Sequence, residues 1–330
     1  MSNDRLSDIG EVEALRRLCM RLPAGRYVRT GAGDDCAVIG MQGLIKPGRG
    51  RPGAVPRSAH DLLLTSDPVI ESVHFKAGTP SPAIGHKALA RVLSDIAAMG
   101  GKPLWCLVDV VAPVRTRMRR ITGIYSAMSK LARRHGVSIA GGDLARGPVL
   151  ELHVFCVGTV PKGKAVLRSG AKPGHKLFVT GSLGGAGSGK HLHFEPRLRE
   201  GQWIADHGWA SAMIDISDGL ASDLRRLNER SGTGAELLLD SIPVSRAVTG
   251  CRGRDAMLAR AFSDGEDYEL LFTVPARKAA LFWDAWKRRF ALSCKCIGTM
   301  TARRGHIECI DHEGKRSALR GRGYEHMRAN

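Results

Sequence analysis

The chain has 330 residues, of which 43% are hydrophobic and 25% are charged, and its formal net charge is +18. This length suits two domains, and this composition excludes a disordered chain. No apolar run is long enough to span a membrane, the first residues do not resemble a signal peptide, and the cysteines form no CxxC pair. We therefore expect a cytoplasmic protein with reduced thiols, without a disulfide framework, a zinc site or a membrane partner.

The sequence predicts alternating helices and strands in the first half of the chain. Apolar residues at Ile9, Val12, Leu15 and Leu18 indicate an amphipathic helix. The predicted helices of this half cover residues 8–22, 83–100 and 121–136, and the glycines at 100–101 stop the second of them. The predicted strands cover residues 61–67, 103–113 and 150–160.

A basic, turn-rich stretch over residues 161–175 predicts a boundary between a domain of residues 1–160 and a domain of residues 161–330. In the second domain the pattern predicts strands over 176–182, 235–240 and 268–275, and a strand, turn and helix over 211–232. Strands and helices mix without a strict βα repeat. The sequence therefore favours an α+β fold of two mixed α/β domains over a doubly wound sheet.

Positive charge is concentrated in several segments, among them Arg115–Arg120 and the Gly- and Pro-rich stretch 46–57, which we expect to be a loop. One interpretation is a polyanionic partner, either nucleic acid or a phosphorylated metabolite. Aromatic residues make up only 5% of the chain, and no nucleic-acid-binding motif is present. A basic solvated surface is therefore the favoured interpretation, and nucleic acid is not an expected partner.

The stretch GGAGSGKH, residues 184–191, comes close to a phosphate-binding P-loop. Its GxxxxGK pattern follows a predicted strand and precedes a possible helix, which is the context that this motif needs. A P-loop also needs a hydroxyl directly after the lysine to bind magnesium, and His191 has none. The favoured interpretation is a flexible glycine turn that opens a helix.

Aspartates recur at predicted turns and strand ends, next to apolar runs. They are Asp34, Asp35, Asp67, Asp95, Asp143, Asp215 and Asp218, and Glu266 and Asp267 add a further acidic turn. Each of them alone is explained as a cap or turn residue. Carboxylates that are brought together repel one another unless cations intervene, and Mg²⁺ binds carboxylates while it keeps phosphate oxygens as ligands. On a basic protein the pattern indicates metal-bridged polyphosphate chemistry.

Asp95 lies in the small, apolar stretch ARVLSDIAAMGG, residues 90–101. Burying an ionised carboxylate there is costly unless a partner neutralises it. Two partners remain open at this point: a magnesium ion, or a nearby Arg or Lys in a purely structural pair.

Six blocks resemble, in order, the thiamine-monophosphate kinase family, of the superfamily that includes aminoimidazole ribonucleotide synthetase and selenophosphate synthetase. The blocks are TSDPVIESVHF, IGHKALARVLSDIAAMG, AGGDLARGP, RSGAKPGHKLFVTG, MIDISDGLASDL and GEDYELLFTV. The resemblance runs from about Asp8 to Tyr324, and the glycine block recurs in that family, which removes the P-loop interpretation. It implies ATP- and Mg²⁺-dependent phosphorylation of thiamine monophosphate to thiamine diphosphate, by direct in-line transfer.

The resemblance also implies a homodimer that pairs the N-terminal sheets, with residues 1–160 binding ATP and magnesium and residues 161–330 completing the active site. The implied ligands of several Mg²⁺ ions are Asp35, Thr65, Ser66, Asp67, Asp95, Asp143 and Asp215, with Asp218 holding a further ion. The implied ATP contacts are Gly142, Asp143, Arg146 and Ser217, and the implied contacts to thiamine monophosphate are His74, Glu266 and Tyr324. Catalysis would depend on Asp67, Asp95, Asp143 and Arg146.

Elementary chemistry agrees with these roles. Because both reactants are anionic, bridging Mg²⁺ ions remove their repulsion, and the attacking phosphate oxygen needs no strong general base. Arg146 suits a bidentate phosphate contact, Glu266 suits the cationic, nitrogen-rich thiamine, and Tyr324 offers a flat face for stacking. The alternative for His74 is a partly buried histidine at a strand end without a binding role.

The chain departs from the family pattern at several positions. Leu144 and Ala145 stand where two threonines are common, Ser72 replaces a glycine, Phe194 and Glu195 replace other expected residues, and the loop 46–60 looks inserted. A superfamily relative that uses ATP on a different small substrate, with synthetase or selenophosphate-type chemistry, is the second hypothesis. A basic nucleic-acid-binding protein is the third.

Overall fold

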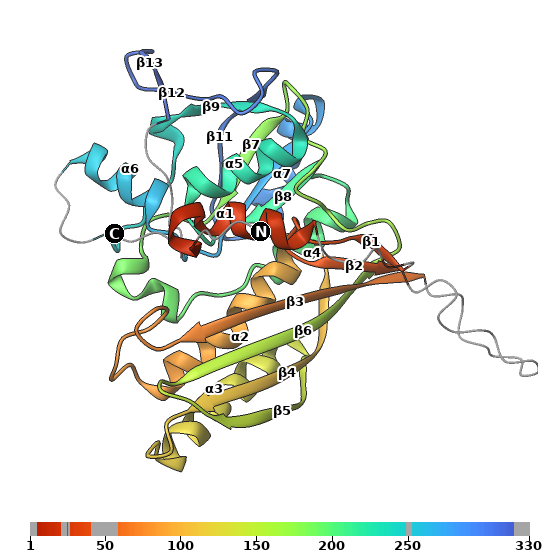
Figure 1. The fold of residues 1–330 in the computed structure, drawn as a ribbon. Coiled ribbons are helices and arrows are strands. Elements are labelled where there is room, and N and C mark those ends of the chain that lie inside the picture. Colours follow the sequence, from red (N-terminus) through yellow and green to blue (C-terminus); the bar gives the residue numbers. More distant parts are fainter. Residues whose placement is uncertain (1–4, 21–24, 26, 41–58, 249–252, 320–330) are drawn as a thin grey trace, which may run out of the picture.

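The computed structural model describes residues 5–20, 25, 27–40, 59–248 and 253–319. Two mixed sheets with helices make up this part of the chain (Figure 1), which confirms the α+β prediction. The loop expected over 46–60 lies almost entirely outside the described residues, as does Tyr324.

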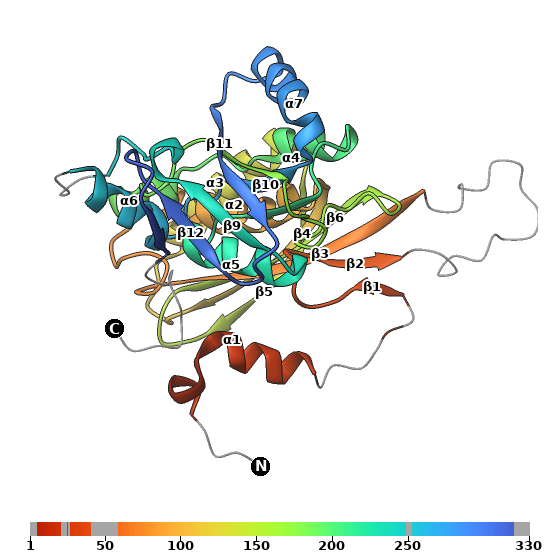
Figure 2. The ribbon, with the colours of Figure 1, turned by 90° about the horizontal axis from the view of Figure 1, so that it is seen from above.

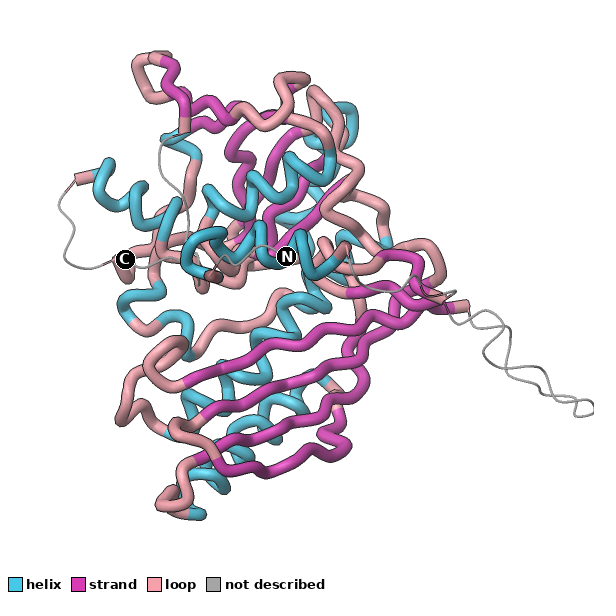
Figure 3. Tube along the Cα trace, in the orientation of Figure 1, coloured by secondary structure: helices cyan, strands magenta, loops and turns pink. Residues whose placement is uncertain are grey.

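The first sheet has the strand order β1-β2-β3-β6-β4-β5. Its strands are β1 (Val28–Thr30), β2 (Ala37–Gly40), β3 (His60–Ile70), β4 (Lys102–Ala112), β5 (Ser138–Arg146) and β6 (Glu151–Pro161). All neighbours are antiparallel except β4 and β5, which run parallel. The helices α2 (Ser81–Ala98) and α3 (Met118–His135) cover one face of this sheet (Figure 3), and no helix of the described part of the chain packs on the other, open face.

The second sheet has the order β13-β12-β9-β11-β7-β10-β8. Its strands are β7 (Lys176–Thr180), β8 (Ala212–Asp215), β9 (Gly234–Leu238), β10 (Leu270–Val274), β11 (Cys294–Thr301), β12 (Ile307–Ile310) and β13 (Arg316–Ala318). The helices of this half are α4 (Leu198–Asp206), α5 (Leu220–Ser231), α6 (Arg254–Ser263) and α7 (Ala276–Arg289), with short 3₁₀ turns at Ala186–Ser188, Lys190–Leu192 and Leu239–Ser241.

Helix α2 lies between the two sheets and carries Asp95 in its last turn. Small residues let neighbouring backbones come close: a Cβ on Gly85 would lie 2.2 Å from the Ile124 oxygen, and one on Gly201 would lie 2.1 Å from the Ala97 oxygen. The helix therefore packs against α3 on one side and α4 on the other, as well as on β3 and β8. This packing brings the end of α2 to the end of β8.

Three local predictions were wrong. The strand expected to end at Asp67 continues to Ile70. It does so because β6 pairs with this strand as far as Ile70. Pro68 is tolerated there because β2, on the other side, pairs only with residues 61–64 and does not need the N–H that proline lacks. Asp143 lies inside strand β5 instead of at a turn or strand end, and the stretch 184–191 forms 3₁₀ turns instead of opening an α-helix.

The first helix, α1 (Leu6–Cys19), confirms the element expected over 8–22, although it bends at Gly10 and residues 21–22 are not described. Figure 2 shows α1 apart from the rest, on the side of the first sheet away from α2 and α3. The side chains of Val12, Leu15 and Leu18 are exposed. The apolar stripe of this helix therefore has no cover within the described part of the chain. No described helix is long and apolar enough to cross a membrane.

Candidate active site

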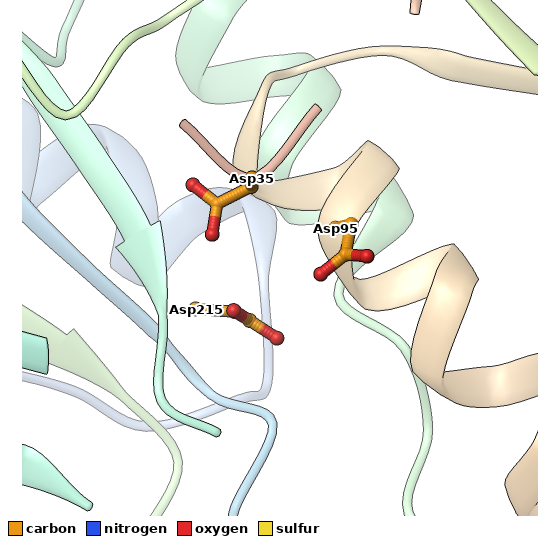
Figure 4. A group of neighbouring side chains, drawn as sticks. All are labelled: Asp35, Asp95 and Asp215. Atoms are coloured by element: carbon orange, nitrogen blue, oxygen red, sulfur yellow. The ribbon is translucent and has the colours of Figure 1, made fainter. Parts of the chain in front are cut away.

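Three carboxylates from distant parts of the sequence meet between the two sheets. Figure 4 shows Asp35, from the segment before β2, Asp95 of α2 and Asp215 at the end of β8 turned toward one common space. Each offers an oxygen, and these oxygens all lie within 4.8 Å of one another. Carboxylate oxygens at such spacing are the ligand set that a hard divalent cation such as Mg²⁺ prefers.

Two hydroxyl groups hold this cluster in place. Thr65 Oγ1 donates to Asp95 Oδ2 at 2.5 Å, and Ser94 Oγ donates to Asp215 Oδ2 at 2.5 Å. Each bond leaves the other oxygen of its carboxylate available. No Lys or Arg among the described residues forms an ion pair with Asp95, so the structural pair considered for this residue has no partner there.

The cluster is electrostatically unfavourable without a cation. Burial first, and then the negative charges of Asp67, Asp215 and Asp35, raise the pKa of Asp95 well above its usual range. Burial, followed by the charge of Asp35, does the same to the pKa of Asp215. A bound divalent cation reverses this balance because it favours the ionised carboxylates. The donor set therefore fits magnesium.

We expect Mg²⁺ to stabilise the protein more at pH 8 than at pH 5. The ligands must lose protons to bind the ion, and the raised pKa values of Asp95 and Asp215 keep protons on them at the lower pH. Saturating Mg²⁺ should raise the Tm by about 5 °C at pH 8 and by less at pH 5. Thermal unfolding of EDTA-treated protein, with and without Mg²⁺, measures this. Equal shifts at both pH values, or none, would contradict the metal site.

An arginine from the segment between β6 and β7 binds the acidic pair before β2. Arg168 Nη2 donates to Asp35 Oδ1 at 2.8 Å, and its Nε donates to Asp35 Oδ2 at 3.3 Å. The backbone N–H of Arg168 donates to Asp34 Oδ1 at 2.6 Å. This fork orients the Asp35 carboxylate and joins the two halves of the chain beside the cluster.

Asp67 lies at the margin of the cluster, and an arginine contacts it. Arg91 Nη2 donates to Asp67 Oδ1 at 3.2 Å, and Arg91 Nη1 donates to the Pro68 carbonyl at 2.8 Å. Thr65 is buried on the α2 side of β3, whereas the adjacent Ser66 is exposed, since successive side chains of a strand alternate in direction. Ser66 therefore does not direct its hydroxyl toward the cluster.

A second cluster of polar side chains surrounds Glu266, which is a predicted substrate contact. Lys87 Nζ donates to Glu266 Oε1 at 2.5 Å and to the His74 carbonyl at 2.5 Å. His191 Nδ1 lies 3.0 Å from Glu266 Oε2. The His74 ring accepts the N–H of Ile70 at its Nδ1, at 3.1 Å. The structure thus brings His74 and Glu266 together through Lys87.

Asp143 and Gly142 do not join the acidic cluster within one chain. Asp67 pairs with Val154, Val154 with Val108, and Val108 with Gly142. Three strand spacings, about 14 Å, therefore separate Asp67 from the β5 edge.

The β5 edge has cavities of its own. Gly142 and Asp143 line one of about 440 Å³, together with Tyr125 of α3. Arg146 lines another of about 490 Å³, together with Arg115. The residues predicted to contact the nucleotide on this strand thus lie together, on the far edge of the sheet from the cluster.

Asp218 and Ser217 follow Asp215 in the turn before α5. Arg226 Nη1 lies 2.5 Å from Asp218 Oδ2 and 2.8 Å from the buried Asp223, so an arginine already compensates the charge at the position predicted for a further ion. Ser217 is half-buried, and its carbonyl accepts the N–H of Glu266 at 2.7 Å. This bond links the turn after β8 to the acidic turn at 264–267.

The glycine-rich stretch is bound to the same acidic turn. Both oxygens of Asp267 accept the N–H of Gly184 at 2.9 Å, and Lys190 Nζ lies 3.4 Å from Asp267. A carboxylate therefore occupies the backbone amides at which a P-loop would hold a phosphate, in agreement with the rejection of that motif.

The positive charge predicted to be a solvated surface includes one concave region. Arg115, Arg117, Arg119 and Arg120 line a cavity of about 600 Å³ at the start of α3, remote from the acidic cluster. All seven cysteines that the structure describes are free.

Sequence reasoning missed Lys87, Arg91, Arg168 and His191, which hold the predicted site residues in place. Lys87, Arg91 and Arg168 lie inside the sequence blocks that resemble the family, so the sequence could have singled them out. Their partners lie far away in the sequence, and no local spacing shows that they meet.

Two family descriptions match this chain. "AIR synthase related protein, N-terminal domain" matches residues 33–160, and "AIR synthase related protein, C-terminal domain" matches residues 172–310. The thiamine-monophosphate kinase of Escherichia coli K12 is 32% identical, over 96% of this chain and 98% of its own. The enzyme of that name from Rhodopirellula baltica is 37% identical, over 81% of this chain and 82% of its own.

Solved structures agree in fold. A structure described as AaThiL complexed with AMPPCP and TMP has a TM-score of 0.80 at 26% identity, and the alignment covers 99% of this chain and 100% of that one. The thiamine-monophosphate kinase of Stenotrophomonas maltophilia K279a has a TM-score of 0.71 at 29% identity, over 92% and 96% of the two chains. The hydrogenase maturation protein HypE, in complex with HypF, has a TM-score of 0.71 at 17% identity, which shows a shared fold alone.

Proposed function

The chain belongs to the thiamine-monophosphate kinase family, within the AIR synthase related proteins, and we propose that it transfers the γ-phosphate of ATP to thiamine monophosphate, giving thiamine diphosphate and ADP. The observation that carries this proposal is the group of the buried Asp35 and Asp215 and the half-buried Asp95, in a chain of this family. A kinase that joins two anionic phosphates needs cations between them. This cluster has the donors to hold them.

Magnesium, when bound, would neutralise the phosphates and align the attacking and leaving oxygens. The chain's own residues would set the geometry. Thr65 and Ser94 orient two of the carboxylates, and Arg168 orients the third. Asp67 lies next to the cluster and completes the proposed ligand set on the β3 side. No Ser–His or Cys–His pair is needed, because the attacking phosphate oxygen is already largely ionised near neutral pH.

We assign the nucleotide and the acceptor to different groups of residues. Gly142, Asp143 and Arg146 border the cavities at the β5 edge and are the proposed nucleotide contacts, with Ser217 near the acidic cluster. His74 and Glu266, which Lys87 joins, are the proposed contacts to thiamine monophosphate. The magnesium roles of Ser66, Asp143 and Asp218 stay predictions, and so do the role of Tyr324 and the division of the chain at residue 160.

A panel of acceptors tests the proposal. Purified protein with ATP and Mg²⁺ is given thiamine monophosphate, thiamine or no acceptor, and ADP and thiamine phosphates are separated by chromatography. We expect ADP and thiamine diphosphate in equal amounts with thiamine monophosphate only. ATP turnover that does not depend on thiamine monophosphate would favour a superfamily relative with another substrate. Absence of turnover from folded protein would favour the binding-protein hypothesis.

We also propose that two chains form a homodimer through the open face of the first sheet. Trp105 and Leu107 of β4 are 51% and 44% exposed on this face, and helix α1, whose apolar stripe is exposed, lies on the same side of the sheet (Figure 2). Such a face is normally covered. The free cysteines support a reducing compartment, and we propose a cytoplasmic location on that ground.

Leu107→Asp should convert the dimer to a monomer, because it places a charge at the centre of the proposed apolar contact. Light scattering coupled to gel filtration measures the mass. Leu281→Asp, at an exposed apolar residue of α7, is the matched control and should leave the mass unchanged. A monomeric wild-type protein, or a variant that stays dimeric, would contradict this interface.

A further inference from the structure

Lys87 is fully buried and lies outside the acidic cluster. Its ammonium group donates to Glu266 Oε1 at 2.5 Å and to the His74 carbonyl at 2.5 Å, and His191 Nδ1 lies 2.6 Å away. An ammonium group has three N–H donors, and two of them thus bind Glu266 and His74. Burial lowers the pKa of Lys87 to about 8, although the charge of Glu266 acts in the opposite direction. Burying an ammonium group is costly, so a lysine at this buried position needs an explanation.

The position of Lys87 on α2 suggests an explanation for its burial. Lys87, Arg91 and Asp95 follow one another at steps of four residues, so they lie along one side of the helix. Lys87 contacts Glu266, Arg91 contacts Asp67, and Asp95 belongs to the cluster. One rigid helix thus connects the predicted substrate contact to the proposed metal ligands.

Glu266 itself has an unusual backbone conformation. Its φ is +52°, and that of Gly265 before it is +68°, so both residues lie in the left-handed region, which residues other than glycine rarely adopt. Burial would raise the pKa of Glu266, but the hydrogen bond from His191 and the charge of Lys87 outweigh it and lower the pKa to about 2. The carboxylate is therefore ionised throughout the physiological pH range, with Lys87 on one oxygen and His191 beside the other.

We propose that Lys87 is a positioning residue for substrate specificity, which fixes the Glu266 carboxylate and the His74 backbone as acceptors for the thiamine end of the substrate. This inference rests on the proposed function. Since Lys87 already compensates the charge of Glu266, the pair offers hydrogen-bond acceptors at fixed places and not an uncompensated negative charge. The thiamine end of the substrate should therefore be selected by its N–H donors. A carboxylate displaced from this position would no longer accept hydrogen bonds from those donors.

The first test compares KM values in purified full-length variants. Lys87→Met removes the ammonium group at similar length, and we expect the KM for thiamine monophosphate to rise about 10-fold or more, with the KM for ATP within about 2-fold of wild type. Lys87→Arg keeps the charge but cannot place three donors in the same way, and it should give a smaller rise. Lys130→Met, at an exposed lysine of α3, is the control and should change neither constant.

A double-mutant cycle separates positioning from general damage to the fold. In a Glu266→Gln background, Lys87→Met should change the KM for thiamine monophosphate by less than about 2-fold, because the residue that Lys87 positions has already lost its charge. Equal effects of Lys87→Met in both backgrounds, or parallel rises in both KM values, would overturn the inference. If Lys87→Met does not fold, Lys87→Arg in the same cycle gives the same decision.

Failure of this inference is distinct from failure of the proposed function. A wild-type protein that makes no thiamine diphosphate refutes the function. An active wild-type protein whose Lys87 variants keep the wild-type KM for thiamine monophosphate refutes the positioning role alone.

Discussion

Asp95→Asn should lower the kcat for thiamine diphosphate formation by about 1000-fold or more, since several kcal/mol of charge stabilisation by the metal would be lost. Asp95 lies at the centre of the proposed metal site, with oxygens of Asp35 and Asp215 within 4.8 Å. An amide keeps the shape of the side chain and removes the charge that holds the cation. Steady-state rates with saturating ATP, Mg²⁺ and thiamine monophosphate measure the change.

The same variant should be more stable than wild type when metal is absent. The folded-state pKa of Asp95 is raised above its unfolded value. Its favourable contribution is therefore complete below the unfolded pKa of about 3.9 and is lost as the pH rises through the folded value. At pH 8 without metal, Asp95→Asn removes this repulsion and should raise the free energy of unfolding by about 1 kcal/mol.

Added Mg²⁺ should reverse that order, because only the wild-type cluster gains from the ion. Asp284→Asn is the matched control, since Asp284 is an exposed residue of α7 that pairs with Lys287. It should leave rate and stability unchanged. An Asp95→Asn variant with near-wild-type kcat, or one that Mg²⁺ stabilises as strongly as wild type, would exclude Asp95 as a ligand.

Arg168→Met should lower the free energy of unfolding by about 3 kcal/mol in the absence of metal, because it leaves a buried carboxylate without its partner. Arg168 binds both oxygens of Asp35 and, through its backbone, Asp34. Without the guanidinium group, Asp35 faces Asp95 and Asp215 with no fixed cation beside it. Urea unfolding of EDTA-treated protein measures the loss.

Mg²⁺ should restore part of that stability, since the ion supplies the missing positive charge to the same carboxylate. Arg199→Met, at an exposed arginine of α4, is the control and should stay within about 0.5 kcal/mol of wild type. A loss at Arg168 that Mg²⁺ does not reduce would show that this arginine acts on packing alone.

The sequence predicted the helices and strands that carry the site more reliably than it predicted how these elements pack together. Apolar periodicity placed the helix around Asp95 and the strand before Asp215, and the structure confirms both. Composition and periodicity also favoured the α+β class correctly. The end of β3 was misplaced because its pairing with β6, which extends to Ile70, is not visible in the sequence of β3 itself.

The grouping of the aspartates could not come from local patterns. Asp35, Asp95 and Asp215 meet only because α2 lies between the two sheets, which is a result of tertiary packing. Asp143 belongs to the same sequence pattern, yet strand order places it at the far edge of the first sheet. The arginines and lysine that hold the site were missed for the same reason: Lys87 and Glu266 are 179 residues apart.

The proposed reaction is tested most directly by following the transferred phosphate. Wild-type protein is incubated with Mg²⁺, thiamine monophosphate and ATP labelled in the γ-phosphate, and the products are separated by chromatography. We expect the label to enter thiamine diphosphate, one for each ADP formed, and EDTA or Asp95→Asn to abolish the transfer. Label that appears only as inorganic phosphate, at a rate independent of thiamine monophosphate, would contradict it.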